Sequence, residues 1–125
     1  MSQNHGKVWW TELRTRDVQG ALKYYRAVCG WHFEQVPMGP AGYYVGKRGD
    51  QAVLGVMDMS NLQEAEGRPP HWFSYFAVKD VDKAVEQTRE RAGQVIKEPF
   101  EIPFVGRVAI VTDPTGAAFG LIKPA

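Results

Sequence analysis

The segment "TDPTGAAFGLIKP", Thr112 to Pro124, reads as a tight turn followed by a strand. Asp113-Pro114-Thr115-Gly116 has the residue types that β-turns favour, and Ala117–Ile122 is apolar and suited to a strand. Gly120 interrupts that strand, and a glycine inside a strand often marks a place where another group approaches the backbone closely. The stretch therefore predicts a turn, a strand and a spot that is kept free of a side chain.

The same arrangement occurs earlier in the chain. Gly55 stands 65 positions before Gly120, inside the strand candidate Gln51–Asp58, and Asp17 stands 63 positions before Asp80, each where a helix cap is expected. Two similar units that each bury one face of a sheet are expected to pair. The sequence therefore predicts an internal duplication.

Each half reads as β-α-β-β-β. In the first half the strands are expected at Lys7–Arg14, Trp31–Pro37, Gly42–Lys47 and Gln51–Asp58, with a helix between a cap at Asp17 and a stop at Gly30. In the second half they are expected at His71–Val78, Val95–Phe100, Arg107–Thr112 and Ala117–Ile122, with a helix between Asp80 and Gly93. The prediction is one domain, residues 1–125, made of modules at about 7–58 and 71–123 with a connector at 59–70. The fold class is α+β, with curved sheets around an open cleft.

The first helix is predicted to bury an apolar stripe. The stripe follows a three-to-four spacing and consists of Val18, Ala21, Leu22, Tyr25, Val28 and Cys29. Cys29 is therefore expected to be a buried, unreactive thiol, and one tyrosine of the pair Tyr24-Tyr25 is expected to be exposed.

Composition excludes some functions. The 125 residues are 44% hydrophobic, which suits one compact core, and 15 basic against 14 acidic side chains give no field that would attract nucleic acid or an anionic membrane. No apolar run approaches the roughly 20 residues that span a bilayer, and "MSQNHGK" has no signal-peptide pattern. One cysteine allows no internal disulfide, so a cytoplasmic location is expected.

Three stretches together resemble the vicinal oxygen chelate superfamily, which includes glyoxalase I, bleomycin-resistance proteins and extradiol dioxygenases. They are "WWTELRTRDVQGALKYYRAVCGW", "WFSYFAVKDVDKAV" and "TDPTGAAFGLI", and the resemblance covers nearly the whole chain. It implies the fold given above, and it implies a reaction much less directly, because one fold hosts many functions.

The resemblance also implies where a metal ion would be held. In metal-dependent members four side chains converge, one from the first and one from the last strand of each module. In this sequence those positions are Trp10, Gly55, Phe73 and Gly120. Indole and phenyl rings offer no lone pair for a divalent ion, and glycine offers no side chain. We therefore expect no metal and no other cofactor, and a cleft where aromatic rings fill the space or stack on a flat ligand.

The neighbouring polar residues allow two interpretations. Strand alternation places Glu12 and Arg14 on the face of Trp10, and His71 and Tyr75 on the face of Phe73. Glu12 is a candidate general base or ligand anchor with Arg14 as an anion clamp, or the two form an internal ion pair. His71 is a candidate catalytic residue or lies at the rim, and the Tyr75 hydroxyl is a candidate for orienting a ligand.

The sequence therefore leaves the function open between classes. The first hypothesis is a metal-independent protein that binds a small hydrophobic or aromatic molecule through Trp10, Arg14, Gly55, Phe73, Tyr75 and Gly120. The second is a glyoxalase-like lyase, isomerase or dioxygenase that uses Glu12 with His71 or Tyr75, with or without an atypical metal site. Binding to a protein partner is a third. A homodimer is expected, because it is the commonest small assembly.

Overall fold

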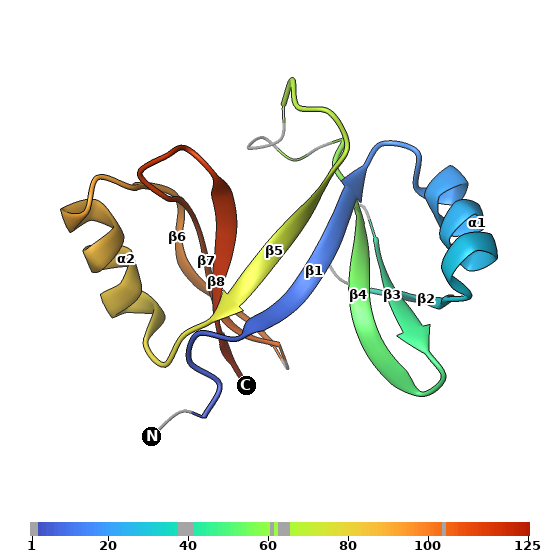
Figure 1. The fold of residues 1–125 in the computed structure, drawn as a ribbon, viewed down its shortest axis with the longest axis horizontal. Helices are drawn as coiled ribbons and strands as arrows, with labels where there is room; N and C mark the ends of the chain where they lie inside the picture. The colour runs from blue at the N-terminus through green and yellow to red at the C-terminus, as the bar shows by residue number, and fades with distance from the viewer. Residues whose placement is uncertain (1–2, 38–41, 61, 63–65, 104) are drawn as a thin grey trace. The chain divides into compact units, whose positions relative to one another are not determined.

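The computed structural model describes residues 3–37, 42–60, 62, 66–103 and 105–125. The chain divides into two compact units. We call residues 10–72 the first unit, and residues 1–9 together with 73–125 the second unit. The two are shown in Figure 1, and each is described by itself below.

The first unit contains one helix and a four-stranded sheet. Its elements are β1 (Val8–Thr15, which begins in the other unit), α1 (Val18–Cys29), β2 (His32–Val36), β3 (Tyr43–Arg48) and β4 (Gln51–Asp58). The strands lie in the order β2-β3-β4-β1, with β1 parallel to β4 and the other pairs antiparallel. This is the predicted β-α-β-β-β order.

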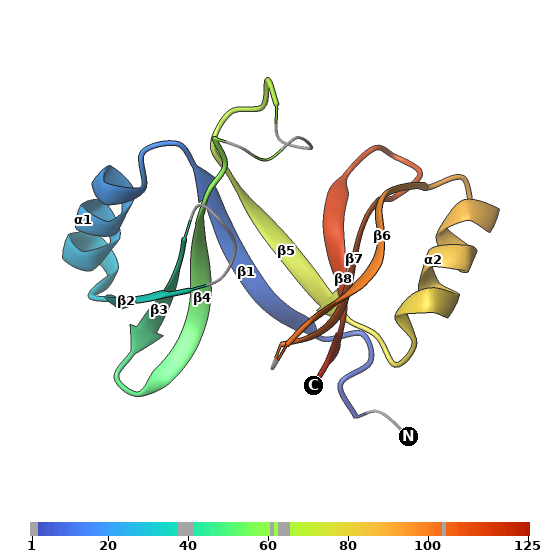
Figure 2. The ribbon, with the colours of Figure 1, turned by 180° about the vertical axis from the view of Figure 1, so that it is seen from behind.

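The second unit repeats the pattern. Its elements are β5 (His71–Ala77, whose first two residues belong to the first unit), α2 (Val81–Glu90), β6 (Gln94–Ile102), β7 (Gly106–Thr112) and β8 (Ala118–Pro124). The strands lie in the order β5-β8-β7-β6, with β5 parallel to β8. The α+β architecture of two βαβββ modules is thus confirmed, and Figure 2 shows from behind the helix that accompanies each sheet.

The predicted caps of α1 are confirmed. The Asp17 carboxylate accepts a hydrogen bond from the Gly20 backbone N–H at 3.0 Å, which satisfies one of the free donors at the helix start. Gly30 ends the helix in the left-handed conformation (φ 71°), and its N–H donates to the Arg26 carbonyl. Both residues therefore do what their types predict.

The end of α2 differs from the prediction. Asp80 caps the start as expected, and its side chain accepts from Lys83 N–H, but the helix ends at Glu90 with Arg91 as the C-cap. Ala92, rather than Gly93, takes the left-handed conformation (φ 69°). Gly93 serves another purpose: a Cβ there would lie 2.5 Å from the Thr112 carbonyl oxygen, so only glycine lets the end of β7 pack this close.

In each unit, one face of the sheet packs against the helix. In the first unit Leu22 of α1 packs with Leu13, Leu54 and Val56. The equivalent core of the second unit consists of Val81 and Val85 of α2 with Ala109, Val111 and Leu121. Each sheet also has a face that turns away from its helix, and the predicted site residues lie on these two helix-free faces.

Some strand boundaries differ from the sequence prediction. β6 extends over Gln94–Ile102 rather than Val95–Phe100, with irregular pairing to β7, and β8 starts at Ala118 and reaches Pro124. The predicted connector at 59–70 lies partly outside the described residues. Neither helix found in the described residues is long and apolar enough to cross a membrane.

Candidate functional site

The helix-free face of the first unit carries Trp10, Glu12 and Arg14 on alternate positions of β1. Glu12 is paired in register with Gly55 of β4, and Arg14 is paired with Met57. Directly paired residues of neighbouring strands point to the same face, so this face also includes Gly55 and its neighbours on β3. The sequence prediction of a shared face is therefore consistent with the register.

Glu12 and Arg14 form a buried ion pair. Arg14 Nε donates to Glu12 Oε2 at 2.9 Å, and the two side chains are only 3% and 4% exposed. The structural interpretation of these residues, an internal ion pair, is confirmed. A charge-assisted hydrogen bond of this kind holds both side chains in one geometry, and it gives the face a fixed dipole. A ligand or catalytic role for either residue stays a prediction.

Trp10 is held by a residue that the sequence reasoning did not select. Its indole Nε1 donates to the Tyr43 hydroxyl oxygen at 2.9 Å, and Tyr43 is almost completely buried. Tyr43 also occupies the space above Gly55: a Cβ on that glycine would lie 1.7 Å from the Tyr43 hydroxyl oxygen. The glycine inside β4 therefore makes room for a tyrosine from β3.

In the second unit the strand glycine is also covered by a tyrosine, but that tyrosine comes from a different strand of the repeat. Gly120 of β8 is paired in register with Tyr75 of β5. A Cβ on Gly120 would lie 2.1 Å from Tyr75 Cδ2, so the tyrosine ring lies over the glycine. Phe73 contacts Tyr75 edge to face, with ring centroids 5.3 Å apart. Phe73, Tyr75 and Gly120 thus form one aromatic contact group.

The two helix-free faces differ in character. In the second unit the face is apolar, with a core of Ala77, Val108 and Ile122 against which Tyr75 packs. In the first unit the same place in the repeat holds the buried ion pair of Glu12 and Arg14 and the Trp10–Tyr43 hydrogen bond. Burial of charge costs free energy unless the charges are paired, and in the first unit the Glu12–Arg14 contact provides that pairing.

His71 lies at the start of β5 and is partly buried. Its Nδ1 lies 2.8 Å from the Pro69 carbonyl oxygen. A carbonyl only accepts, so Nδ1 is the donor in this contact. This fixes the ring orientation, and its predicted catalytic role stays untested.

The four positions that the family resemblance assigns to a metal ion do not fit one. Trp10 uses its only polar atom as a donor to Tyr43, and Gly55 and Gly120 are covered by tyrosines. Phe73 has no donor atom. Across the described ranges, no group of three or more His, Cys, Asp or Glu side chains is placed to hold a metal ion.

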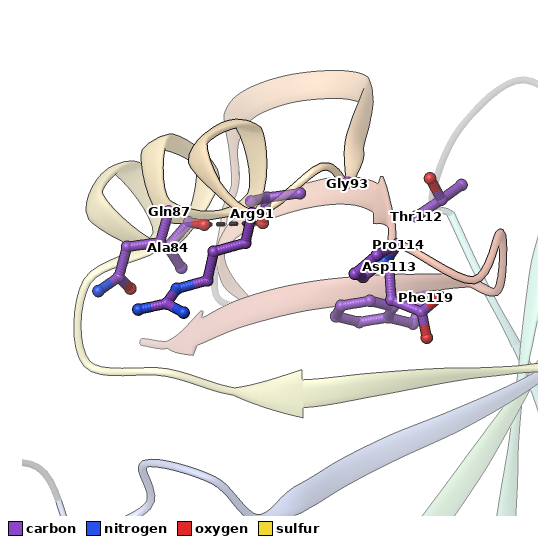
Figure 3. A pocket seen from close by; sticks show the side chains of 9 residues that line it. Ala84, Gln87, Arg91, Gly93, Thr112, Asp113, Pro114 and Phe119 are labelled. Carbon is purple, nitrogen blue, oxygen red and sulfur yellow. Dashed lines mark hydrogen bonds between the residues drawn. The ribbon is translucent and has the colours of Figure 1, made fainter.

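A surface hollow lies elsewhere in the second unit (Figure 3). It has a volume of about 310 Å³ and lies between α2 and the turn before β8. Gln87 and Arg91 of α2 and the Phe119 ring are among its lining residues. Phe119 alternates with Gly120 along β8, so the hollow is on the helix side of the sheet and is separate from the predicted site residues.

The turn at one edge of this hollow contains the Asp113-Pro114-Thr115-Gly116 motif. Asp113 accepts hydrogen bonds from the backbone N–H groups of Thr115 and Ala117 and from the Thr115 hydroxyl. The Thr115 hydroxyl, followed by the Ala117 N–H, lowers the pKa of the Asp113 carboxyl below its usual value. The aspartate therefore holds the turn closed in its ionised form, which is a structural role.

Fold and sequence together define the class as an α+β protein of two βαβββ units. The family model of the glyoxalase/bleomycin resistance protein/dioxygenase superfamily matches residues 7–121. The chain therefore belongs to this superfamily, as its motifs predicted.

Curated relatives agree with this assignment. The chain is 40% identical over 121 residues to "Putative glyoxylase CFP32" of Mycobacterium tuberculosis, a match that covers 96% of this chain and 45% of that protein. It is 27% identical over 123 residues to the anthracycline biosynthesis protein DnrV of Streptomyces peucetius, covering 90% of this chain and 45% of that protein. The chain thus spans about half the length of the curated relatives that it matches.

Solved structures support the fold alone, because their identities are low. Methylmalonyl-CoA epimerase from Mycobacterium tuberculosis superposes with a TM-score of 0.71 at 15% identity, covering 100% of this chain and 93% of the epimerase. A methylmalonyl-CoA epimerase in complex with methylmalonyl-CoA and NH4+ gives 0.69 at 17% identity, covering 97% and 96%.

Proposed function

We propose that the protein binds a small, flat, hydrophobic or aromatic molecule at its helix-free faces and that it does so without the usual divalent ion. The observation that carries this proposal is the replacement of every metal-ligand position by a ring or by a glycine under a ring. Trp10 and Tyr75 remain partly accessible, whereas Tyr43 and Phe73 are buried beside them. An accessible ring backed by a buried one is a rigid surface on which a planar ligand stacks.

The names of two relatives favour this class of ligand. DauV of Streptomyces sp. strain C5 and DnrV of Streptomyces peucetius are both named as anthracycline biosynthesis proteins. Anthracyclines contain fused planar rings. A planar polycyclic molecule is therefore the ligand class that we propose, with the buried Glu12–Arg14 pair near Trp10 as the polar end of the surface.

The binding test uses two adjacent tryptophans. Trp10→Leu removes the proposed stacking ring, and Trp9→Leu is the matched control because Trp9 is exposed and alternation directs it to the opposite face. Doxorubicin, titrated by its own fluorescence, is the probe. An aromatic contact is worth about 0.5–1.5 kcal/mol beyond its burial, so Trp10→Leu should weaken binding by about tenfold while Trp9→Leu changes it by less than about twofold.

Either of two results contradicts the proposal. One is the absence of doxorubicin binding by the wild-type protein together with a metal-free native mass spectrum that shows no co-purified organic molecule. The other is an equal loss of binding in both tryptophan variants. A stoichiometric transition metal in that spectrum would contradict the metal-independent part of the proposal, and it would direct attention to Glu12 and His71 as ligands.

A second candidate function is a glyoxalase-like enzyme, favoured by the name of the relative at 40% identity. In this case Glu12 moves a proton, with His71 or Tyr75 as a second group. Its assay is the isomerisation of the methylglyoxal–glutathione hemithioacetal, with and without added divalent metal. If Glu12 is the base, Glu12→Gln should lower turnover by about a hundredfold or more, and retained turnover would exclude that role.

Two further properties are part of the proposal. A homodimer is proposed as the assembly, and a specific surface for it is argued below. A reducing, cytoplasmic location suits the single thiol of Cys29, which is exposed. Localisation of a tagged full-length chain in the source cell would test the second property.

A further inference from the structure

Helix α1 has a second apolar face, which turns away from its own sheet. The predicted buried stripe is confirmed at Leu22, but Val28 is 62% exposed and Cys29 is exposed too, contrary to the prediction. Tyr24 is 58% exposed. Tyr24 and Val28 are four residues apart and so lie one above the other on the helix surface. An exposed apolar pair of this kind is not part of the unit's own core.

The repeat supplies an internal control for this observation. At the constant offset of 63 positions, Tyr24 and Val28 of α1 correspond to Gln87 and Arg91 at the end of α2, and Ala27 corresponds to Glu90. The three residues on α2 are exposed and polar. The fold therefore tolerates a fully solvated exterior at this place, and the apolar exterior of α1 is a property of this helix alone.

Aromatic contacts extend the exposed face beyond the helix. Tyr24 contacts Tyr25 edge to face (centroids 5.0 Å apart), and Tyr25 contacts Trp72 in the same manner (5.5 Å). Trp31 stacks on Tyr25 at 5.5 Å and meets Trp72 at 6.4 Å. We call the set Tyr24, Tyr25, Val28, Trp31 and Trp72 the aromatic ridge. All five residues lie in the first unit.

The area of the ridge is sufficient for the centre of an interface. On a common scale of about 200 Å² per side chain, the exposed fractions of Tyr24, Val28 and Trp72 (58%, 62% and 39%) amount to roughly 300 Å². A stable interface buries about 800 Å² on each partner, with an apolar centre and a polar rim. The ridge therefore has the size and the residue types, tyrosine and tryptophan, that dominate interface energies.

We propose that the aromatic ridge is a self-association surface whose occupant is the same ridge of a second copy of this chain. Area favours this occupant, because a two-fold contact buries the patch on both copies at once. Charge permits it, since the formal net charge is only +1. Lys23, next to Tyr24 on the helix, is exposed and has a long stem that places its charge in water.

The proposal is independent of the proposed ligand, because the ridge is on the α1 side of the sheet and the ligand face is on the other.

The test replaces the ridge with the residues that the second helix carries. The full chain with Tyr24→Gln and Val28→Arg is compared with the wild type by sedimentation equilibrium, and Gln87→Ala with Arg91→Ala on α2 is the matched control. Loss of a few central interface residues on both copies should raise the dimer dissociation constant by about a hundredfold or more. The control should leave it unchanged. Both positions on α1 are exposed, so the variant should keep the wild-type circular dichroism spectrum.

Cys29 gives a second readout that does not depend on hydrodynamics. It is the only cysteine, it is exposed and it follows Val28 directly, so a short bismaleimide can join only two chains. Cross-linking should be efficient in the wild type and in the α2 control and should be lost in the ridge variant. The proposal is overturned if the wild-type chain is monomeric at about 100 µM, or if a dimer persists with unchanged affinity in the folded ridge variant.

Discussion

Removal of one partner of the Glu12–Arg14 pair should destabilise the protein strongly. Arg14→Met keeps the length of the side chain and removes the guanidinium, which leaves the Glu12 carboxylate buried without its 2.9 Å partner. Both side chains are at least 96% buried. Breaking a buried ion pair from one side costs about 3–5 kcal/mol, because the remaining charge loses the oppositely charged group nearest to it.

That cost is large enough to measure by thermal unfolding. A chain of 125 residues should lose about 4 °C of Tm for each kcal/mol, so the expected fall is about 12–20 °C. The double variant Glu12→Leu with Arg14→Met removes both charges, and replacement of a buried pair by apolar side chains is often close to neutral. It should therefore recover most of the loss.

The assay is a double-mutant cycle by calorimetry, with urea unfolding as a second measure of the free energy. Arg16→Met is the matched control: Arg16 is exposed and donates to the Arg68 carbonyl at 2.9 Å, and its loss should cost about 1 kcal/mol. A compensating pair is contradicted if Arg14→Met costs no more than Arg16→Met, or if the double variant loses as much stability as the single variants Glu12→Leu and Arg14→Met combined. Either result would mean that Glu12 and Arg14 do not compensate each other's charge.

Three further outcomes are expected. Gly55→Ala should destabilise by about 1–3 kcal/mol because its Cβ must displace the Tyr43 hydroxyl 1.7 Å away; a wild-type Tm would contradict this contact. Gly120→Ala should cost a similar amount through the Tyr75 ring, and its loss should be smaller in a Tyr75→Ala background; an unchanged loss would show that the strain lies elsewhere. The lowered pKa of Asp113 means that its contribution to stability is present above about pH 4 and is lost as the pH falls through the folded-state pKa, so Asp113→Asn should flatten the acid side of the stability–pH curve, and parallel curves would contradict this.

Much of the fold was predictable because the helix caps and the turn form hydrogen bonds with residues close to them in sequence. The caps Asp17 and Asp80 and the turn at Asp113 act through residues within four positions of themselves, so sequence spacing identifies them. The end of α2 was not predictable in this way. Gly93 has the sequence position of a helix stop. The structure shows that a side chain is excluded there because the Thr112 carbonyl is too close, and only the tertiary structure brings that carbonyl near.

The candidate site was predictable in part for the same reason. Strand alternation is local, so it placed Trp10, Glu12 and Arg14 on one face. Tyr43 was missed because its hydrogen bond to Trp10 joins residues 33 positions apart. One signal could have indicated it: a glycine inside a strand often marks the close approach of another group, and an aromatic side chain on an adjacent strand can cover such a glycine.

Val28 shows a different limit of sequence reasoning. A three-to-four spacing identifies apolar positions, but it does not state which of two apolar faces meets the sheet. On α1 the face that includes Leu22 is buried, and the face with Tyr24 and Val28 is exposed. Comparison with the equivalent helix of the repeat resolves this ambiguity, because Gln87 and Arg91 mark the solvent side.

The two units share a strand glycine with room for a ring above it, but the tyrosine that occupies this room comes from a different strand in each unit. Gly55 and Gly120 occupy equivalent places, yet the ring over Gly55 comes from the antiparallel neighbour β3 and the ring over Gly120 comes from the parallel neighbour β5. The space is thus filled by tyrosine in both units, although the tyrosine comes from a different strand in each. A ligand on these faces would meet aromatic rings and not open backbone, so affinity should follow the planar area of the ligand more closely than its number of charges.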